Sequence, residues 1–201
     1  MTLFNREESL RRRLNIFLSQ TFGLPELDYY ATLGPEAFLG LKSVLADINN
    51  ILTLRVSFAF VDWIALRLEL DSQAKLELKK IVLEAKPNSN GFDVWLGYPI
   101  AFVAEVKCNI PINQGLIYGS AQRHGIEKDV IALLQGKRRA SINSQSCPKF
   151  IAFLDLPQIR SANAHLLRIS KTCKEGLVFV SESTEFNRLD VVYGVYVSPE
   201  P

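Results

Sequence analysis

The sequence predicts an α/β fold in which a mixed central β-sheet is flanked by helices. The first 55 residues follow the helical period, the apolar period then changes from about 3.6 to about 2, and helix-like and strand-like segments alternate to the end. With 201 residues and 48% hydrophobic content, the chain has the size and composition of one compact domain covering residues 1–201.

The helical first part covers residues 1–55. An amphipathic run extends from Glu7 to Phe17, and a loop follows at Gly23-Leu24-Pro25. A second helix opens at Gly34-Pro35-Glu36, because proline suits the first helical turn. The next stretch, from about Ser57 to Leu78, also has helical periodicity, and Ser57 is expected to cap its start.

A three-stranded meander is expected next. Ile81-Val82-Leu83 is followed by the turn signal Pro87-Asn88-Ser89-Asn90-Gly91, and Phe92 to Gly97 and Ile100 to Cys108 form a hairpin over Tyr98-Pro99. The remaining elements are a helix over Tyr118 to Arg139, a strand over Lys149 to Leu154, a helix over Ala162 to Thr172, and strands over Leu177 to Val180 and Val191 to Val197.

Composition argues against several classes of protein. The apolar stretches are too short and too interrupted by charge to span a bilayer, and the first residues lack the apolar centre of a secretory signal, so we expect a cytoplasmic protein. Cys108, Cys147 and Cys173 lie far apart, which predicts free thiols. His124 and His165 are too few for a multi-histidine metal site. A net charge of +2 does not decide for or against a nucleic-acid partner.

The strand predicted over Ile100 to Cys108 carries charge on one face. Alternation puts Glu105 and Lys107 on the same face and only apolar side chains on the other. An unpaired carboxylate on such an apolar strand costs free energy unless it meets a cation, a hydrogen-bond donor or water. The pair therefore requires an explanation.

Asp93, on the neighbouring strand, can share that face. If Asp93 faces Glu105, the turn is centred on Pro99 and the loop has an odd number of residues, whereas a two-residue Tyr98-Pro99 turn would put the carboxylates on opposite faces. Directly opposed Cβ atoms lie roughly 4.5 to 5.5 Å apart. Two carboxylates at that distance can share a hard cation and would repel each other without one.

These residues resemble a known nuclease core. Gly91-Phe92-Asp93-Val94-Trp95-Leu96 and Phe102-Val103-Ala104-Glu105-Val106-Lys107 are similar to the D-x(n)-E-x-K core of the PD-(D/E)XK superfamily, which includes many restriction enzymes and Holliday-junction resolvases. Phe92, where the motif has proline, is a departure. The resemblance implies a restriction-endonuclease-like sheet. The resemblance covers a nuclease-like core (57–156). A helical N-terminal part (1–55) precedes this core, and a C-terminal helix with strands (157–201) follows it.

The resemblance also implies an activity, a Mg²⁺- or Mn²⁺-dependent endonuclease that hydrolyses DNA phosphodiester bonds. Asp93 and Glu105 would bind the metal ion, with the main-chain carbonyl of Val106 as a further ligand, and Lys107 would orient or activate the attacking water. Mg²⁺ is commonly held by one or two carboxylates, which agrees with that assignment. A homodimer is expected, because cutting both strands of a duplex usually takes two sites.

Further candidates follow from position. Many members of the superfamily place a glutamate on the preceding helix, which suggests Glu69 as a metal ligand, although a helical charge usually faces solvent. Side chains of the helix after the hairpin could contact DNA phosphates, and the basic cluster at its end could instead complement the helix dipole. These residues are Gln122, Arg123, Lys128, Lys137, Arg138 and Arg139.

The E-x-K pattern alone is weak, since the chain contains three such triplets. Glu77-Leu78-Lys79 has a helical context, in which residues two apart diverge, and Glu84-Ala85-Lys86 is ended at once by Pro87. Glu105-Val106-Lys107 lies in the predicted hairpin, with Glu105 and Lys107 on the same face of the strand, which favours a catalytic role. The alternative is a structural ion pair, such as Asp93 with Lys107. Trp63 and Trp95 are expected in the core.

Two other functions stay open. A nuclease-like fold could bind DNA or a protein partner without cutting it. Alternatively, Glu69, Asp93 and Glu105 could form a metal site for other phosphate esters, such as nucleotides.

Overall fold

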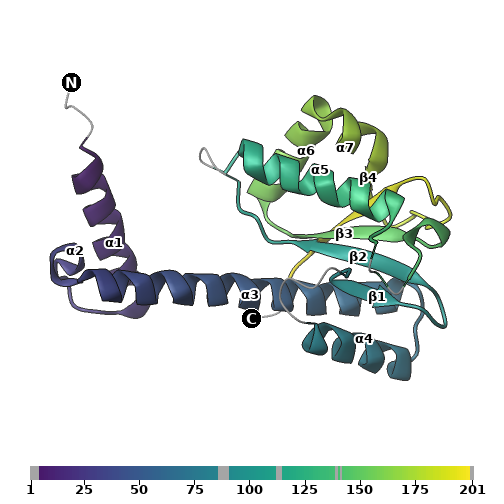
Figure 1. The fold of residues 1–201 in the computed structure, drawn as a ribbon, viewed down its shortest axis with the longest axis horizontal. Helices are drawn as coiled ribbons and strands as arrows, with labels where there is room; N and C mark the ends of the chain where they lie inside the picture. Colours follow the sequence, from purple (N-terminus) through teal and green to yellow (C-terminus); the bar gives the residue numbers. More distant parts are fainter. Residues whose placement is uncertain (1–4, 86–90, 112–114, 139, 141, 200–201) are drawn as a thin grey trace. The chain divides into compact units, whose positions relative to one another are not determined.

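The protein divides into two compact units, Met1–Ile48 and Asn49–Pro201, and the boundary lies within one long helix. The structure is a computed structural model that describes residues 5–85, 91–111, 115–138, 140 and 142–199. Figure 1 labels the elements. They are α1 (Arg6–Phe22), α2 (Tyr29–Thr32), α3 (Pro35–Arg67), α4 (Ser72–Glu84), β1 (Val94–Leu96), β2 (Phe102–Lys107), α5 (Ser120–Gln135), η1 (Ser144–Ser146), β3 (Lys149–Leu154), α6 (Pro157–Ile169), α7 (Lys171–Gly176), β4 (Leu177–Phe179) and β5 (Val192–Val197).

The larger unit is built on a mixed β-sheet. Among the described residues the sheet has five strands in the order β1-β2-β3-β5-β4. The edge strand β1 runs antiparallel to β2, and the pairs β2 with β3, β3 with β5 and β5 with β4 are parallel. The expectation of a mixed sheet flanked by helices is therefore confirmed.

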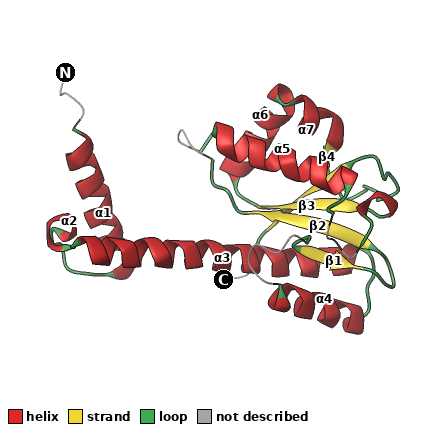
Figure 2. Ribbon diagram, in the orientation of Figure 1, coloured by secondary structure: helices red, strands yellow, loops and turns green. Residues whose placement is uncertain are grey.

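Helices cover both faces of this sheet (Figure 2). On one face, Phe60 of α3 and Leu78 of α4 pack with Phe102 and Phe150 in one buried cluster. On the other face, α5, α6 and α7 pack over the alternate residues, such as Val103 and Ile151. Each strand thus points its side chains alternately into two apolar layers. Trp63 and Trp95, which were expected in the core, are half-buried and pack against these clusters.

The expected helix start at Ser57 is wrong. Ser57 lies inside α3, which continues to Arg67. Its hydroxyl donates to the Thr53 carbonyl oxygen at 2.8 Å, so the side chain is satisfied one turn back along the helix and does not interrupt it. The break comes later, where Asp71 caps the start of α4 by accepting from the Ala74 N–H at 2.7 Å.

The expected strand at Ile81-Val82-Leu83 is also wrong, because α4 continues to Glu84. Ala74, Leu78 and Val82 are four residues apart and buried, so the helical period places them on the sheet-facing side. The meander is thus a two-stranded hairpin preceded by a helix. The turn signal was placed on residues 87–91, of which 87–90 lie outside the described residues.

The later elements follow their expected order. β3 has the predicted bounds, and β4 and β5 lie within the predicted strand segments. The helix expected up to Arg139 ends at Gln135, before Gly136 at a φ of 90°. The helix expected over Ala162 to Thr172 is two helices, α6 and α7, which meet at Ser170. All three cysteines are free thiols, as predicted.

Candidate active site

The β1–β2 hairpin has the register that the candidate site requires. Trp95 faces Val103 and Leu96 faces Phe102, with Val94 opposite Ala104. These three pairs confirm the predicted register of the hairpin, with the turn centred on Pro99. Asp93 comes directly before β1, and the same register extended by one residue would bring it opposite Glu105.

The Asp93 carboxylate is fixed against β2. Its Oδ2 atom accepts a hydrogen bond from the Val106 N–H at 2.8 Å. The residue is half-buried. Its charge is one of the causes that raise the pKa of Glu105, so the two carboxyl groups lie near each other.

Glu105 is buried, and its surroundings disfavour the charged form of its carboxyl group. The residue is 5% exposed, and burial, followed by the nearby charge of Asp93, raises its pKa to about 8 although the Lys137 ammonium opposes this shift. Its Oε1 atom lies 2.5 Å from Lys137 Nζ in an ion pair, without hydrogen-bond geometry to any described residue. A carboxylate in that state favours a further cation or donor.

Lys137 reaches this pair from beyond the end of α5. Its Nζ atom also donates to the Gly91 carbonyl oxygen at 2.6 Å and lies 5.1 Å from the centre of the Phe92 ring. The side chain is only 21% exposed. A residue predicted to contact DNA or to complement the helix dipole is instead the internal counter-ion of Glu105.

Lys107 lies on the same face of β2 as Glu105 and forms an ion pair with Asp129 of α5. The two side chains are 21% and 17% exposed. The suggested alternative pair, Asp93 with Lys107, is not the one formed. The sequence analysis missed Asp129. The available signal was its position three residues after Ile126 and four before Leu133, on the face of α5 that packs on the sheet.

Glu69 is not brought to this group. It lies in the turn after α3 with a φ of 50°, and its side chain is exposed. Among the described residues, no three or more Asp, Glu, His or Cys side chains are gathered for a metal ion, so Glu69 does not form a common site with Asp93 and Glu105.

The other candidate DNA contacts are distributed along and beyond α5. Gln122 accepts from the Gly119 N–H at 3.0 Å and donates to the Ile110 carbonyl oxygen at 2.8 Å, so it caps the start of the helix. Arg123 is half-buried, and Lys128 and Arg138 are exposed. Arg139 lies outside the described residues.

In the described part of the chain, the two histidines and the other E-x-K triplets do not join this group. His124 is 83% exposed and lies 3.9 Å from Glu127, and His165 is half-buried, so neither is gathered with the carboxylates. Of the other E-x-K triplets, Lys79 pairs with Asp62 at 3.1 Å, and Glu84 lies 4.0 Å from Lys80 in an exposed helical pair. Lys86 lies outside the described residues.

Asp93 and Glu105 are ligands of the kind that a divalent cation takes. The charge of Asp93 acts on Glu105, and Glu105 Oε1 has no hydrogen bond within the described residues, although it lies in an ion pair with Lys137. Mg²⁺ is bound in this way, by one or two carboxylates with water and substrate phosphate in its other positions. The residues that would hold the ion are Asp93 and Glu105, with the Val106 carbonyl as the expected third ligand.

Comparisons with known protein families, curated proteins and solved structures found no match for this chain.

Proposed function

We propose that this protein is a metal-dependent endonuclease of the PD-(D/E)XK type that hydrolyses phosphodiester bonds in DNA. The observation that carries the proposal is the hairpin register, which, extended by one residue, would bring Asp93 opposite Glu105, with Lys107 two residues further along the same face of β2. Two carboxylates and an ammonium in this arrangement match the metal ligands and the charged residue of that reaction.

The electrostatics of the site support the same function. Burial beside Asp93 raises the pKa of Glu105 to about 8, so the ionised form needs positive charge. A bound Mg²⁺ or Mn²⁺ would supply that charge, polarise the phosphate and lower the pKa of a bound water. Such a role accounts for a carboxylate kept on an otherwise apolar strand.

The chain's own residues have separate roles in this proposal. Asp93 and Glu105 hold the cation. Lys107 places an ammonium near the negative charge that develops on the phosphate, and Asp129 orients that ammonium through their ion pair. The exposed Lys128 and Arg138 offer positive charge to the DNA backbone.

The proposed fold is restriction-endonuclease-like in part of the larger unit. The hairpin, α5 and β3 reproduce the order acidic strand, E-x-K strand, helix and strand. The departure is α4, a helix directly before the hairpin where the resemblance implied a strand. The proposal therefore rests on the hairpin and its charged residues.

A nuclease assay tests the proposal. Purified protein is incubated with supercoiled and linear DNA in Mg²⁺ or Mn²⁺, beside an EDTA control and the Asp93→Asn and Lys107→Ala variants. We expect metal-dependent cutting that EDTA abolishes and that each variant lowers by at least about a hundredfold, the scale for loss of one electrostatic group.

The chain offers a matched control. Lys79→Ala makes the same change in an E-x-K triplet that lies on a helix and pairs with Asp62 outside the site. This variant should cut at the wild-type rate. Equal loss in both lysine variants, or cutting that survives Lys107→Ala, would contradict the proposal.

A second function is favoured by one observation. The two lysines of the site, Lys107 and Lys137, are already paired with Asp129 and Glu105, so the group can also serve as a half-buried ion-pair network in a module that binds DNA without cutting. Tight DNA binding with no turnover in Mg²⁺, Mn²⁺ or varied substrates would support this alternative.

A further inference from the structure

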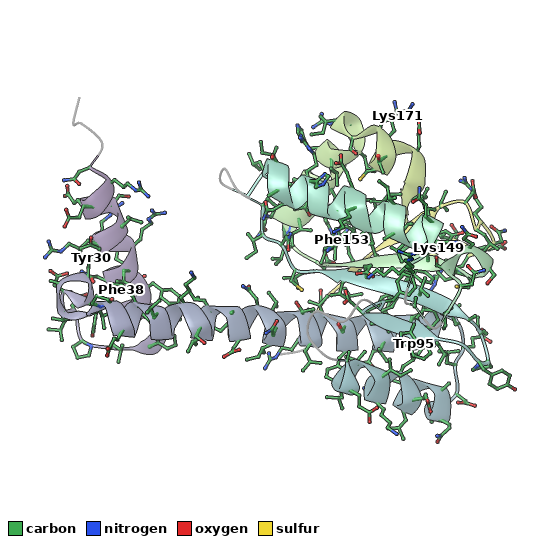
Figure 3. All side chains as sticks on the ribbon, viewed as in Figure 1. Tyr30, Phe38, Trp95, Lys149, Phe153 and Lys171 are labelled. Carbon is green, nitrogen blue, oxygen red and sulfur yellow. The ribbon has the colours of Figure 1, made fainter. Side chains whose placement is uncertain are left out.

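A row of three side chains crosses the sheet from the candidate active site. Lys107 of β2 is in register with Phe153 of β3, and Phe153 is in register with Tyr196 of β5. Residues in register point to the same face of a sheet, and Phe153 is buried between this face and the helices that cover it (Figure 3). Because the three strands are parallel, the row lies at their carboxyl ends, where open α/β sheets commonly bind ligands.

Tyr196, at the far end of the row, is held in place by its neighbours. Its ring stacks on Phe179, with ring centres 4.8 Å apart and an interplanar angle of 9°. Its hydroxyl oxygen accepts a hydrogen bond from Asn163 Nδ2 at 3.2 Å. Asn163 is fully buried and itself accepts from the Tyr118 hydroxyl at 3.0 Å. The Tyr196 ring is therefore a fixed platform at the carboxyl end of β5.

Arg160 of α6 lies on this platform. Its guanidinium carbon is 4.1 Å from the centre of the Tyr196 ring. Its Nε and Nη2 atoms donate to the two carboxylate oxygens of Asp155, at 2.6 Å and 2.9 Å. The ring fixes the plane of the guanidinium and the carboxylate fixes its direction within that plane, so the Nη1 edge is oriented before any ligand arrives. The Arg160 side chain is 53% exposed, so a ligand can reach it.

A second arginine shows the same ion pair in a different place. Arg188 donates to both carboxylate oxygens of Asp190, at 3.1 Å and 2.7 Å, and its side chain is 56% exposed. This pair lies in the loop before β5, at the opposite end of the sheet from the row. Exposed ion pairs stabilise a fold little. The ring and the buried asparagine that order Arg160 therefore indicate a binding role for this one.

The ligand that suits the Arg160 edge is a phosphate group, because guanidinium N–H groups bind phosphate oxygens two at a time. Neighbouring strands lie about 4.8 Å apart, so two steps along the row put Tyr196 about 10 Å from Lys107. A DNA strand advances about 3.4 Å per nucleotide. A strand that lies along the row with its scissile phosphate at Lys107 would bring a phosphate about three nucleotides away to Arg160.

We infer that Arg160, oriented by Tyr196 and Asp155, binds a phosphate of the DNA backbone about three nucleotides from the phosphate to be cut. The inference rests on the proposed function, because Lys107 marks the position of the scissile phosphate. Arg160 is a positioning residue in this scheme. It fixes the DNA along the row and takes no part in breaking the bond.

DNA affinity, measured without cutting, tests the inference. Fluorescence anisotropy of labelled duplex DNA is recorded with Ca²⁺ in place of Mg²⁺ at several salt concentrations. Arg160→Met should weaken binding by about tenfold and reduce the slope of log affinity against log salt by about one, the loss of one phosphate contact. Arg188→Met removes the arginine of the other ion pair, so it should match the wild type in both affinity and slope.

Arg160→Lys keeps the test valid if Arg160→Met fails to fold. Lysine keeps the positive charge and loses the fork that binds two oxygens, so the slope should stay at the wild-type value while the affinity falls. A wild-type affinity and slope in Arg160→Met, or an equal loss in Arg188→Met, overturns the inference.

Cutting assays separate this inference from the nuclease proposal. A wild type that cuts DNA while Arg160→Met binds DNA as tightly as the wild type overturns the phosphate contact alone. A wild type that binds DNA through Arg160 and does not cut it overturns the nuclease proposal and leaves the contact standing. A wild type that binds no DNA overturns both.

Discussion

Lys137 Nζ lies 2.5 Å from Glu105 Oε1, so a lysine from beyond the end of α5 supplies the positive charge nearest to the buried carboxylate of β2. The same ammonium is held by the Gly91 carbonyl oxygen and the Phe92 ring. In the proposed nuclease, a divalent cation and this ammonium would neutralise the same carboxylate. Lys137 is therefore expected to compete with the metal ion.

The first prediction concerns metal affinity. Lys137→Met removes the internal cation and leaves Asp93 and Glu105 without compensation, so Mn²⁺ should bind about five- to tenfold more tightly, near 1 kcal/mol. Isothermal titration calorimetry of metal-free protein measures this. Lys128→Met, which changes an exposed lysine of α5, should leave the affinity unchanged. Weaker binding in Lys137→Met would show that the lysine supports the metal site.

The second prediction concerns pH. The folded-state pKa of Glu105, about 8, lies above its ordinary value of 4.5, so the folded protein favours the neutral carboxyl. The stability from this group is complete below about pH 4.5 and is lost as pH rises through about 8, with a slope of at most about 1.4 kcal/mol per pH unit.

Urea denaturation in EDTA between pH 5 and pH 9 checks this dependence. Glu105→Gln cannot ionise, so its free energy of unfolding should fall less than that of the wild type over this range. The pKa of Asp155 is lowered by its hydrogen bond with Arg160, so the stability that this group contributes is lost only toward acid pH. The Asp155→Asn variant should therefore still show the fall in the free energy of unfolding between pH 5 and pH 9. Parallel wild-type and Glu105→Gln profiles would refute the assignment.

The third prediction concerns the sheet. A Cβ atom on Gly194 of β5 would lie 2.7 Å from Cε1 of Phe179, and that ring cannot simply turn away because it stacks on Tyr196 at 4.8 Å. Gly194→Ala should therefore lower the free energy of unfolding by about 1 to 3 kcal/mol. Gly125→Ala in α5, where a Cβ meets nothing within 4 Å, should raise it by about 0.5 to 1 kcal/mol. Chemical denaturation measures the free energy of unfolding of both variants. Equal changes in the two would contradict the close approach of Phe179 to Gly194.

The hairpin register was predicted from the candidate site and not from the turn sequence, which allowed a two-residue Tyr98-Pro99 turn as well. Only an odd loop centred on Pro99 would keep Asp93 and Glu105 on one face, and the observed pairs have that register. The strand Lys149–Leu154 was predicted from a local pattern, since a short apolar run between turn signals is typical of a buried strand.

The strand predicted at Ile81-Val82-Leu83 was wrong because its three residues were interpreted apart from the helix before them. Leu78 and Val82 are both buried in the same cluster, and that packing outweighs the strand preference of β-branched residues. Ser57 was misinterpreted for the same reason, because its local capping preference gave way to a continuous apolar face.

The charged partners of the site depend on contacts that are distant in the sequence. Asp129 and Lys137 meet Lys107 and Glu105 only because α5 docks on the sheet, and no local pattern gives that position. What the sequence did offer was an acidic residue on the inward face of a helix, next to Val130. An inward charge opposite an E-x-K strand is a usable signal for a partner residue.

The last prediction concerns Lys107 and Asp129, which form one ion pair between β2 and α5. If Asp129 acts by orienting the ammonium, Lys107→Ala should lower kcat for DNA cutting by at least about a hundredfold and Asp129→Asn by about tenfold, with KM little changed. The double variant should be no slower than Lys107→Ala alone, because Asp129 has no effect once its partner is absent.

Glu127→Gln is the control for this cycle, since Glu127 is another acidic residue of α5 and its partner is the exposed His124, at 3.9 Å. Its kcat should equal that of the wild type. DNA affinity of each variant, measured with Ca²⁺ in place of Mg²⁺, separates binding from turnover. If the losses from Lys107→Ala and Asp129→Asn multiply in the double variant, Asp129 acts on the reaction by itself, and its orienting role is disproved.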